Sequence, residues 1–230
     1  MRQPDKRLGA AAELVRQGAV FADIGTDHAL LPVFLCQTGK VLRAIAADIN
    51  EGPLAAAKAQ VTSAGLTDKI TLRLTNGLLG LEDEGLTDIA ICGMGGELIT
   101  EILSCAPFVR HRDIRLILQP MTHARDLRYY LAREGFAIVE ERTATANGKC
   151  YFCFAAEYTG EPYTITRTEA TFGKIERGRA DDTLIALIEK EKRGQEKKCR
   201  GLRAGGISDS GEEAYLSDLT ELLKELSYDS

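Results

Sequence analysis

Short apolar runs alternate with helical stretches through the first two thirds of the chain. Each run is almost continuously apolar, as is typical of strands buried on both faces of a parallel sheet. The predicted strands are Val20–Ile24, Arg43–Asp48, Ile70–Leu74, Asp88–Cys92 and Ile114–Leu118. Helices are predicted at Leu8–Arg16, Leu30–Gln37, Gly52–Gly65, Glu97–Leu103 and Arg125–Arg133. Repeated β–α units with right-handed crossovers predict a parallel sheet covered by helices on both faces.

Two further apolar runs follow without a helix between them. They are Phe136–Arg142 and Cys150–Tyr158, and Asn147-Gly148 between them is typical of a tight hairpin turn. A closing hairpin adds an antiparallel strand. We therefore expect an α/β fold with a mostly parallel, seven-stranded sheet.

The pattern changes past Gly160. A polar connector runs to about Ala180, and two helical stretches, 182–202 and 212–228, flank Gly205-Gly206. Apolar residues recur at three- and four-residue steps in the second stretch, which predicts a packing stripe against the first. We expect two domains, residues 1–160 and a C-terminal helical hairpin over 161–230.

Composition limits the cellular context. A chain of 230 residues can hold one α/β domain and a smaller appendage. It has no apolar segment long enough to span a membrane, and residues 1–7 lack the apolar core of a signal peptide, so a cytoplasmic protein without a membrane partner is expected. The C-x-x-C pair Cys150 and Cys153 falls in a predicted strand, where residues three apart face opposite sides, so no metal site is expected.

The net charge of −5 does not by itself suggest nucleic acid. Basic residues nevertheless gather locally: six arginines lie between Arg110 and Arg133, and seven Lys or Arg residues lie between Lys190 and Arg203. Local patches decide phosphate binding, although charged helical runs are often only solvated faces. The candidate RNA-binding residues are Arg125, Arg128, Arg200 and Arg203.

Polar residues and glycines follow the ends of all five predicted parallel strands. Ligands of open α/β sheets bind at these carboxyl ends. The candidate cofactor-binding residues are Asp23, Gly25, Thr26, Asp27, His28, Asp48, Ile49, Asn76, Gly77, Gly93, Met94, Gly95 and Gly96. The fifth strand ends at Gln119-Pro120.

The loop after the first strand discriminates between nucleotide cofactors. A dinucleotide site needs three glycines around its pyrophosphate, whereas this loop has only Gly25, and Asp27 would repel phosphate. Asp48, about twenty residues on, is placed to accept hydrogen bonds from both hydroxyls of a ribose. S-adenosylmethionine (SAM), which has ribose and adenine, a cationic sulfonium and no phosphate, suits these residues. The alternative is that Asp23 and Asp27 only cap the next helix.

Other positions have two interpretations. Asn76 either takes the adenine amino group or forms a plain Asn-Gly turn. The glycines of 93–96 either allow close approach of the backbone to a methionyl chain or form a tight strand-to-helix turn, which needs only one glycine. His28 is either an acid–base partner of Asp27 or part of a helix-start network.

Several motifs together resemble one family. They are Arg7-Leu8, Asp23–His28, Asn50–Leu54, Asn76-Gly77, Gly93–Gly96 and Leu116–Pro120. In this order they resemble the TrmK family of bacterial tRNA adenine-N1 methyltransferases over residues 6–158. The resemblance implies the class I SAM-dependent methyltransferase fold, which is Rossmann-like, with a C-terminal coiled-coil-like helical domain. It also implies SAM as cofactor, tRNA as partner and methyl transfer to N1 of adenine 22. The chain departs from the family at Leu30, where tyrosine is usual, and at Met121, where asparagine is usual.

The chemistry expected is in-line methyl transfer to the lone pair of adenine N1, which needs no deprotonation. Asp27 and Gln119 are the candidate catalytic residues: Asp27 would stabilise the cationic product, and Gln119 would border the base pocket. Tyr129 and Tyr130 are either stacking residues or helix packing. The alternatives are a non-catalytic SAM- or RNA-binding protein and a small-molecule methyltransferase. A monomer is expected, with a dimer as the alternative.

Overall fold

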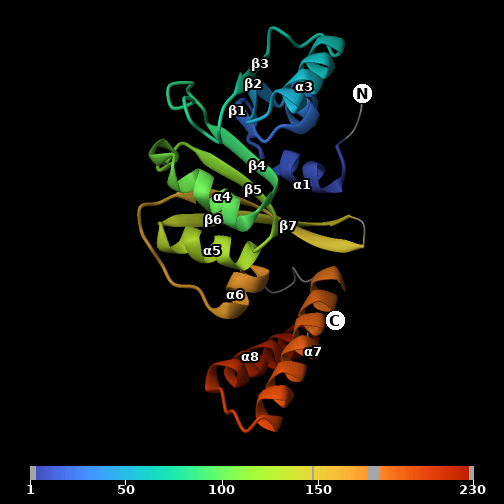
Figure 1. Cartoon of the computed structure of the whole chain (residues 1–230), viewed down its shortest axis with the longest axis vertical. Coiled ribbons are helices and arrows are strands. Elements are labelled where there is room, and N and C mark those ends of the chain that lie inside the picture. The colour runs from blue at the N-terminus through green and yellow to red at the C-terminus, as the bar shows by residue number, and fades with distance from the viewer. Residues whose placement is uncertain (1–3, 147, 176–181, 228–230) are drawn as a thin grey trace. The chain divides into compact units, whose positions relative to one another are not determined.

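The chain forms two units of contacts, Met1–Thr164 and Ile165–Ser230. The computed structural model describes residues 4–146, 148–175 and 182–227 (Figure 1). Three predicted features therefore lie partly or wholly outside the described residues: the turn residue Asn147, the end of the polar connector at Ala180, and Tyr228.

The first unit is built on one seven-stranded sheet with the order β3-β2-β1-β4-β5-β7-β6. Its strands are β1 (Ala19–Ile24), β2 (Val41–Asp48), β3 (Ile70–Leu74), β4 (Asp88–Gly95), β5 (Arg115–Thr122), β6 (Phe136–Ala146) and β7 (Lys149–Tyr158). Strands β1 to β5 are parallel, and β7 runs antiparallel to both β5 and β6. The predicted fold class, including the closing hairpin, is confirmed.

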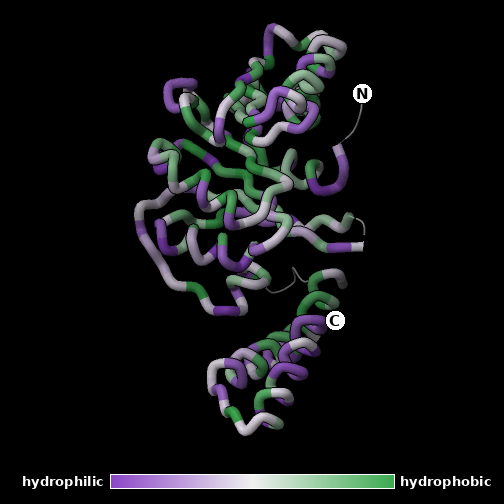
Figure 2. The backbone as a smooth tube through the Cα atoms, in the orientation of Figure 1, coloured by the Kyte–Doolittle hydropathy of each residue, from purple (hydrophilic) through white to green (hydrophobic). Residues whose placement is uncertain are grey.

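Alternation along the strands divides the core into two layers. Phe21 belongs to one buried cluster and its neighbour Ala22 to the other, because successive side chains point to opposite faces. The first cluster contains buried residues of α1 (Lys6–Leu14), α2 (Leu30–Gln37) and α3 (Glu51–Ser63). The second contains those of α4 (Gly96–Ser104) and α5 (Ala124–Arg133). Helices therefore cover both faces of the sheet, as predicted, and the tube in Figure 2 shows the central strands as its most continuously hydrophobic part.

Two element boundaries differ from the prediction. Helix α1 begins at Lys6, earlier than expected, because the Asp5 carboxylate caps it by accepting from the N–H groups of Arg7 and Leu8 at 2.9 and 3.0 Å. Strands β4 and β5 continue past their expected ends and remain paired as far as Gly95 and Thr122, with two register shifts. Gly93–Gly95 and Gln119-Pro120, which were predicted to follow the strand ends, are therefore still part of the sheet.

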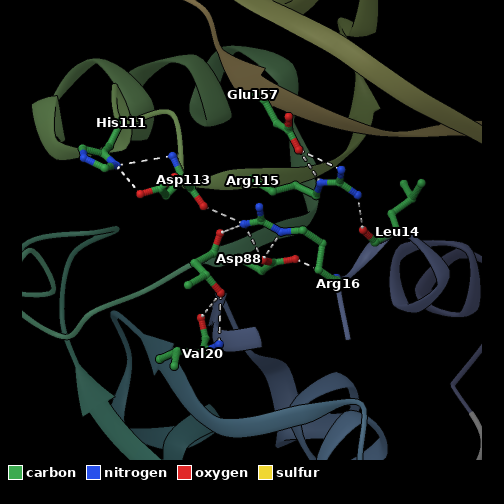
Figure 3. Close-up of polar contacts among 9 residues, drawn as sticks. Leu14, Arg16, Val20, Asp88, His111, Asp113, Arg115 and Glu157 are labelled. Carbon is green, nitrogen blue, oxygen red and sulfur yellow. Dashed lines mark hydrogen bonds and ion pairs between the residues drawn. The ribbon is translucent and has the colours of Figure 1, made fainter. Parts of the chain in front are cut away.

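A charged cluster joins α1 to the amino ends of the central strands (Figure 3). Asp88 is fully buried at the start of β4 and accepts from both the backbone N and Nε of Arg16 at 2.8 Å. The same guanidinium donates to the carbonyls of Thr87 and Asp113. This cluster fixes the chain between α1 and β1 against β4, at the edge of the sheet opposite the strand ends that were predicted to bind ligand.

The second unit contains the helices α6 (Arg167–Phe172), α7 (Asp182–Ala204) and α8 (Ser210–Ser227). The helical hairpin was predicted, but α6 was not. Helices α7 and α8 pack together, with Tyr215 and Leu219 of the predicted stripe buried. Glu212 accepts from Lys198, Gln195 and Arg167, and these bonds, led by that from Lys198, lower the pKa of its carboxyl to about 2.

Candidate active site

A cleft of about 610 Å³ opens at the carboxyl ends of β1, β2, β3 and β4. The structure brings ten of the predicted cofactor residues to its lining: Asp23, Gly25, Thr26, Asp27, Asp48, Ile49, Asn76, Gly77, Gly93 and Met94. His28, Gly95 and Gly96 do not line it. Strand ends far apart in sequence therefore converge on one cavity, as the sheet topology requires.

The loop after β1 is attached to β2. Gly25 has φ +75°, and its N–H and that of Thr26 both donate to the Ala47 carbonyl, at 2.8 and 3.0 Å. A Cβ at Gly25 would overlap the Met94 side chain, so the missing side chain here makes room for Met94 at the cleft wall. Two non-glycine residues then follow in the left-handed region, His28 (φ 61°) and Ala29 (φ 50°). Such backbone strain is common at functional sites.

Asp27 lies at the open side of the cleft. Its carboxylate side chain is 78% exposed, and Oδ1 lies 3.3 Å from His28 Nε2. The contact supports neither interpretation of His28 over the other, but it keeps the imidazole beside the carboxylate. Asp27 is thus accessible to a ligand.

Asp23 and Asp48 are the buried carboxylates of the cleft. Burial raises the pKa of Asp23 to about 6, with a smaller contribution from the Asp48 charge, although the Thr26 hydroxyl donates to Asp23 Oδ2 at 2.7 Å and opposes the shift. Asp48 Oδ1 accepts from Asn50 N at 2.9 Å, and within the described chain Oδ2 has no hydrogen-bond partner. Asp48 therefore has acceptor capacity left for a ligand in the cleft.

Gln119 lies behind the cleft wall and does not line the cleft. The residue is fully buried; its Oε1 accepts from Gly93 N at 3.2 Å and from Arg7 at 3.4 Å, and its Nε2 donates to the Pro120 carbonyl. Gln119 was predicted as a catalytic residue at the border of the base pocket, and this must be corrected: the side chain is buried, and both ends of its amide hold the ends of β4 and β5. Unlike Gln119, Arg7 lines the cleft, and it also contacts Met121 Sδ at 3.1 Å.

Gly95 and Gly96 make a close backbone approach possible. A Cβ at Gly96 would overlap the His123 carbonyl oxygen and lie 2.9 Å from its carbon, and a Cβ at Gly95 would lie 3.2 Å from Thr122 Oγ1. These glycines therefore allow the turn into α4 to pack on the loop before α5. Of the two interpretations of the glycines of 93–96, Gly95 and Gly96 therefore fit the strand-to-helix turn and not contact with a methionyl chain.

Sequence reasoning missed the contribution of α1 to the cleft. Asp5, Arg7 and Leu8 line it, and Arg7 is held by Asp5 Oδ2 at 2.8 Å. The motif Arg7-Leu8 carried part of the family resemblance, but no local pattern indicated that it would reach the strand ends. The other unpredicted lining residues are Ile24, Leu30, Leu31, Asn50, Thr75, Cys92, Leu98 and Ile102.

The arginines between residues 110 and 133 are mostly engaged inside the first unit. Arg128 is 1% exposed, bonds to Glu141 at 2.7 Å, and lies over the rings of Phe152 and Phe154. The prediction that Arg128 binds RNA must be corrected, because its guanidinium is buried within the protein. Arg110, Arg115 and Arg133 are likewise paired with carboxylates.

The remaining RNA-binding candidates are exposed. Arg125 is 45% exposed and lies 3.7 Å from Asp126. In the second unit Arg203 pairs with Glu213 at 3.1 Å, whereas Arg200 is exposed.

Among residues 4–146, 148–175 and 182–227, no cluster of three or more His, Cys, Asp or Glu side chains is arranged to hold a metal ion. In the same part of the chain no helix is both long and apolar enough to cross a membrane.

The sheet order, the closing antiparallel hairpin and the cleft at the carboxyl strand ends define a class I methyltransferase domain. The family described as "Methyltransferase domain" matches residues 5–154. The tRNA (adenine(22)-N(1))-methyltransferase of Bacillus subtilis is 41% identical over 152 residues, which are 66% of this chain and 64% of that enzyme. The chain belongs to the TrmK family.

Two solved structures support this assignment. Streptococcus pneumoniae Sp1610, solved in complex with S-adenosyl-L-methionine, is 32% identical, with a TM-score of 0.81 over 95% of this chain and 99% of that one. TrmK of M. capricolum, solved with S-adenosyl-homocysteine, is 25% identical, with a TM-score of 0.75 over 99% of this chain and 97% of that one. The likeness to both extends beyond the methyltransferase domain to nearly the whole chain.

Proposed function

We propose that this protein methylates N1 of an adenine in tRNA, using SAM as the methyl donor. The observation that carries the proposal is the acidic cleft at the strand ends, with the buried Asp48 at the position where a ribose is bound in this fold. The name of the B. subtilis relative assigns that enzyme to adenine 22. We extend the same substrate to this chain.

The cleft residues fit SAM and do not fit a pyrophosphate. Among the described residues that line the cleft, four carboxylates, those of Asp5, Asp23, Asp27 and Asp48, stand against one guanidinium, that of Arg7. Such a charge distribution repels phosphate and attracts a cation. Bound SAM supplies an electrophilic methyl group on its sulfonium. Asp48 would hold the ribose, Asn76 the adenine, and the backbone near Gly25 and Gly93 the methionyl part.

The protein's own task in the reaction is orientation. Adenine N1 reacts through an in-plane lone pair, so no general base is required, and the base must be turned out of any pair or stack to expose its Watson–Crick edge. The methylated base is a cation. Asp27, an exposed carboxylate at the cleft, would stabilise that charge. Gln119 would act indirectly, by fixing Gly93 and Arg7.

The second unit has a basic face on α7. Lys190, Arg193, Lys197 and Arg200 are all exposed and follow three- and four-residue steps, so they share one side of the helix. Within the described chain Lys190, Lys197 and Arg200 have no carboxylate at ion-pair distance. The opposite side is buried through Ile188, Gln195 and Cys199. We propose this basic face, in place of Arg128, as a set of phosphate contacts.

The function is tested by incubating the protein with SAM and tRNA and analysing the digested nucleosides by mass spectrometry. We expect 1-methyladenosine at one tRNA position. Asp48→Ala should abolish product and weaken SAM binding in calorimetry by tenfold or more, while tRNA affinity stays unchanged. SAM binding without any RNA product would contradict the proposed function, and undiminished SAM affinity of Asp48→Ala would contradict the ribose role.

A further inference from the structure

A second cavity lies along α1, beside the cleft. Its volume is about 840 Å³, and it is lined by α1 and its flanks, by Thr38 and Lys40 ahead of β2, and by Arg142–Thr145 of β6. Figure 1 shows α1 next to the β6–β7 hairpin, and α1 packs against both strands. We call this cavity the α1 groove. The methyl-transfer cleft already described does not use it.

Cations without carboxylate partners face the α1 groove. Lys6 and Lys40 both line it, and among the described residues neither has a carboxylate within ion-pair distance. Lys40 Nζ donates to the carbonyls of Ala12 and Glu13 at 2.6 and 2.9 Å. An ammonium has three N–H donors, so one remains for a ligand. This distinguishes the groove from the region 110–133, whose arginines are mostly paired.

The remaining polar groups of the groove also suit phosphate. Arg142 lines it while bonded to Glu13 and Glu140, and the side chains of Thr143 and Thr145 are exposed on β6. Asp5, one of the two carboxylates that line the groove, is already engaged by Arg7 and by the first turn of α1. Lysine, arginine and threonine side chains are typical contacts to the phosphates and sugars of a nucleic-acid backbone, which carry no sequence information.

The position of the groove links it to the cleft. Asp5 borders both cavities, so the first turn of α1 is the wall between them. Helix α1 has nine residues, a length of about 13 Å. A strand lying along it would span more than one phosphate and end next to the cleft.

We propose that the α1 groove binds the sugar–phosphate backbone of the tRNA strand adjoining the nucleotide to be methylated; this inference rests on the proposed function. The strand follows α1, Lys6, Lys40 and Arg142 contact its phosphates, and the target nucleotide turns around the first turn of α1 into the cleft.

The test is charge reversal in the groove with a matched control. Lys6→Glu/Thr145→Glu places two carboxylates in the groove at exposed positions, and Lys6 begins α1, where a carboxylate favours the helix. Lys58→Glu/Thr67→Glu makes the same change in charge at exposed positions of α3 and the loop before β3. Both proteins are compared with wild type for tRNA affinity across salt concentrations, SAM affinity and thermal unfolding.

We expect the groove variant to bind tRNA at least tenfold more weakly, with a salt slope reduced by about 1 for the lysine lost. The control should stay within twofold, and SAM affinity and melting temperature should be unchanged in both. If the wild type methylates tRNA and the two variants bind tRNA equally well, the groove proposal is overturned and the proposed function stands. A wild type that binds tRNA without methylating it overturns the proposed function, and selective loss in the groove variant still supports the groove. A wild type that binds no tRNA overturns both.

Discussion

The backbone approach at Gly96 leads to a specific stability prediction. In Gly96→Ala the new Cβ would overlap the His123 carbonyl oxygen and lie 2.9 Å from its carbon and 3.1 Å from the Thr122 carbonyl oxygen. Ordinary contact begins at 3.4 Å, so the loop before α5 must retreat by about 0.5 Å from the carbon and further from the oxygen. All these atoms are backbone, and no rotamer change can relieve the overlap.

The expected magnitude is a net loss of about 1–2 kcal/mol. Overpacking of this kind costs about 1–3 kcal/mol. Alanine in place of glycine returns up to about 1 kcal/mol, because φ at Gly96 is negative and the residue begins a helix. For a chain of this size the melting temperature should fall by about 2–8 °C. Methyl transfer should fall tenfold or more, because the displaced loop adjoins the ends of β4 and β5.

The assay is thermal unfolding by circular dichroism, paired with the nucleoside assay. Gly52→Ala is the matched control: Gly52 is in the first turn of α3, its φ is also negative, and a Cβ there meets nothing within 4 Å. It should be neutral or slightly stabilising. If Gly96→Ala had the same melting temperature as Gly52→Ala and kept wild-type activity, the reasoning from the close backbone approach at Gly96 would be refuted.

Three further predictions concern charged groups. Asp88→Ala should lower the free energy of unfolding in urea by about 2–3 kcal/mol, because it removes a fully buried carboxylate whose partner Arg16 is one-third exposed. Arg73→Ala, which breaks the more exposed ion pair with Glu84, is the comparison, and a smaller loss in Asp88→Ala than in Arg73→Ala would contradict this prediction. Arg128→Ala should lower stability by about 3 kcal/mol and leave the salt slope of tRNA binding unchanged, and a reduced slope with normal stability would restore an RNA role. Glu212 has a folded pKa of about 2 against an ordinary 4.5, so its contribution to stability is complete above pH 4.5 and is lost as the pH falls toward 2. Urea unfolding at pH 7 and pH 3 should show this loss, which Glu212→Gln should reduce; an equal loss in the variant would show that other groups are responsible.

The strands could be predicted because a strand that is buried on both faces must be apolar at nearly every position. Ile89 and Ile91 face one layer and Ala90 the other, and all three must be apolar. The ends of β4 and β5 were harder to place, because glycine and proline usually interrupt strands. Here register shifts accommodate them, and the pairing between β4 and β5 keeps Met94 opposite Pro120.

The site was predictable where topology alone determines position. Asp48 reaches the cleft because it ends a parallel strand next to β1, whatever its side-chain contacts. Arg128 and Gln119 depend on partners that no local pattern reveals. Arg128 is buried because Glu141, Phe152 and Phe154 surround it from the closing hairpin.

The place of Asp5 between the two cavities has a practical consequence for handling the protein. Pro4 and Asp5 already line the α1 groove, and Asp5 also lines the cleft. In an affinity tag fused directly ahead of Pro4, a run of histidines would begin next to a residue that lines the α1 groove, where it would compete for acidic side chains or for RNA. Measurements of cofactor and tRNA affinity are therefore best made with the tag at the other terminus or removed, and a difference between the two preparations would itself report on the first turn of α1.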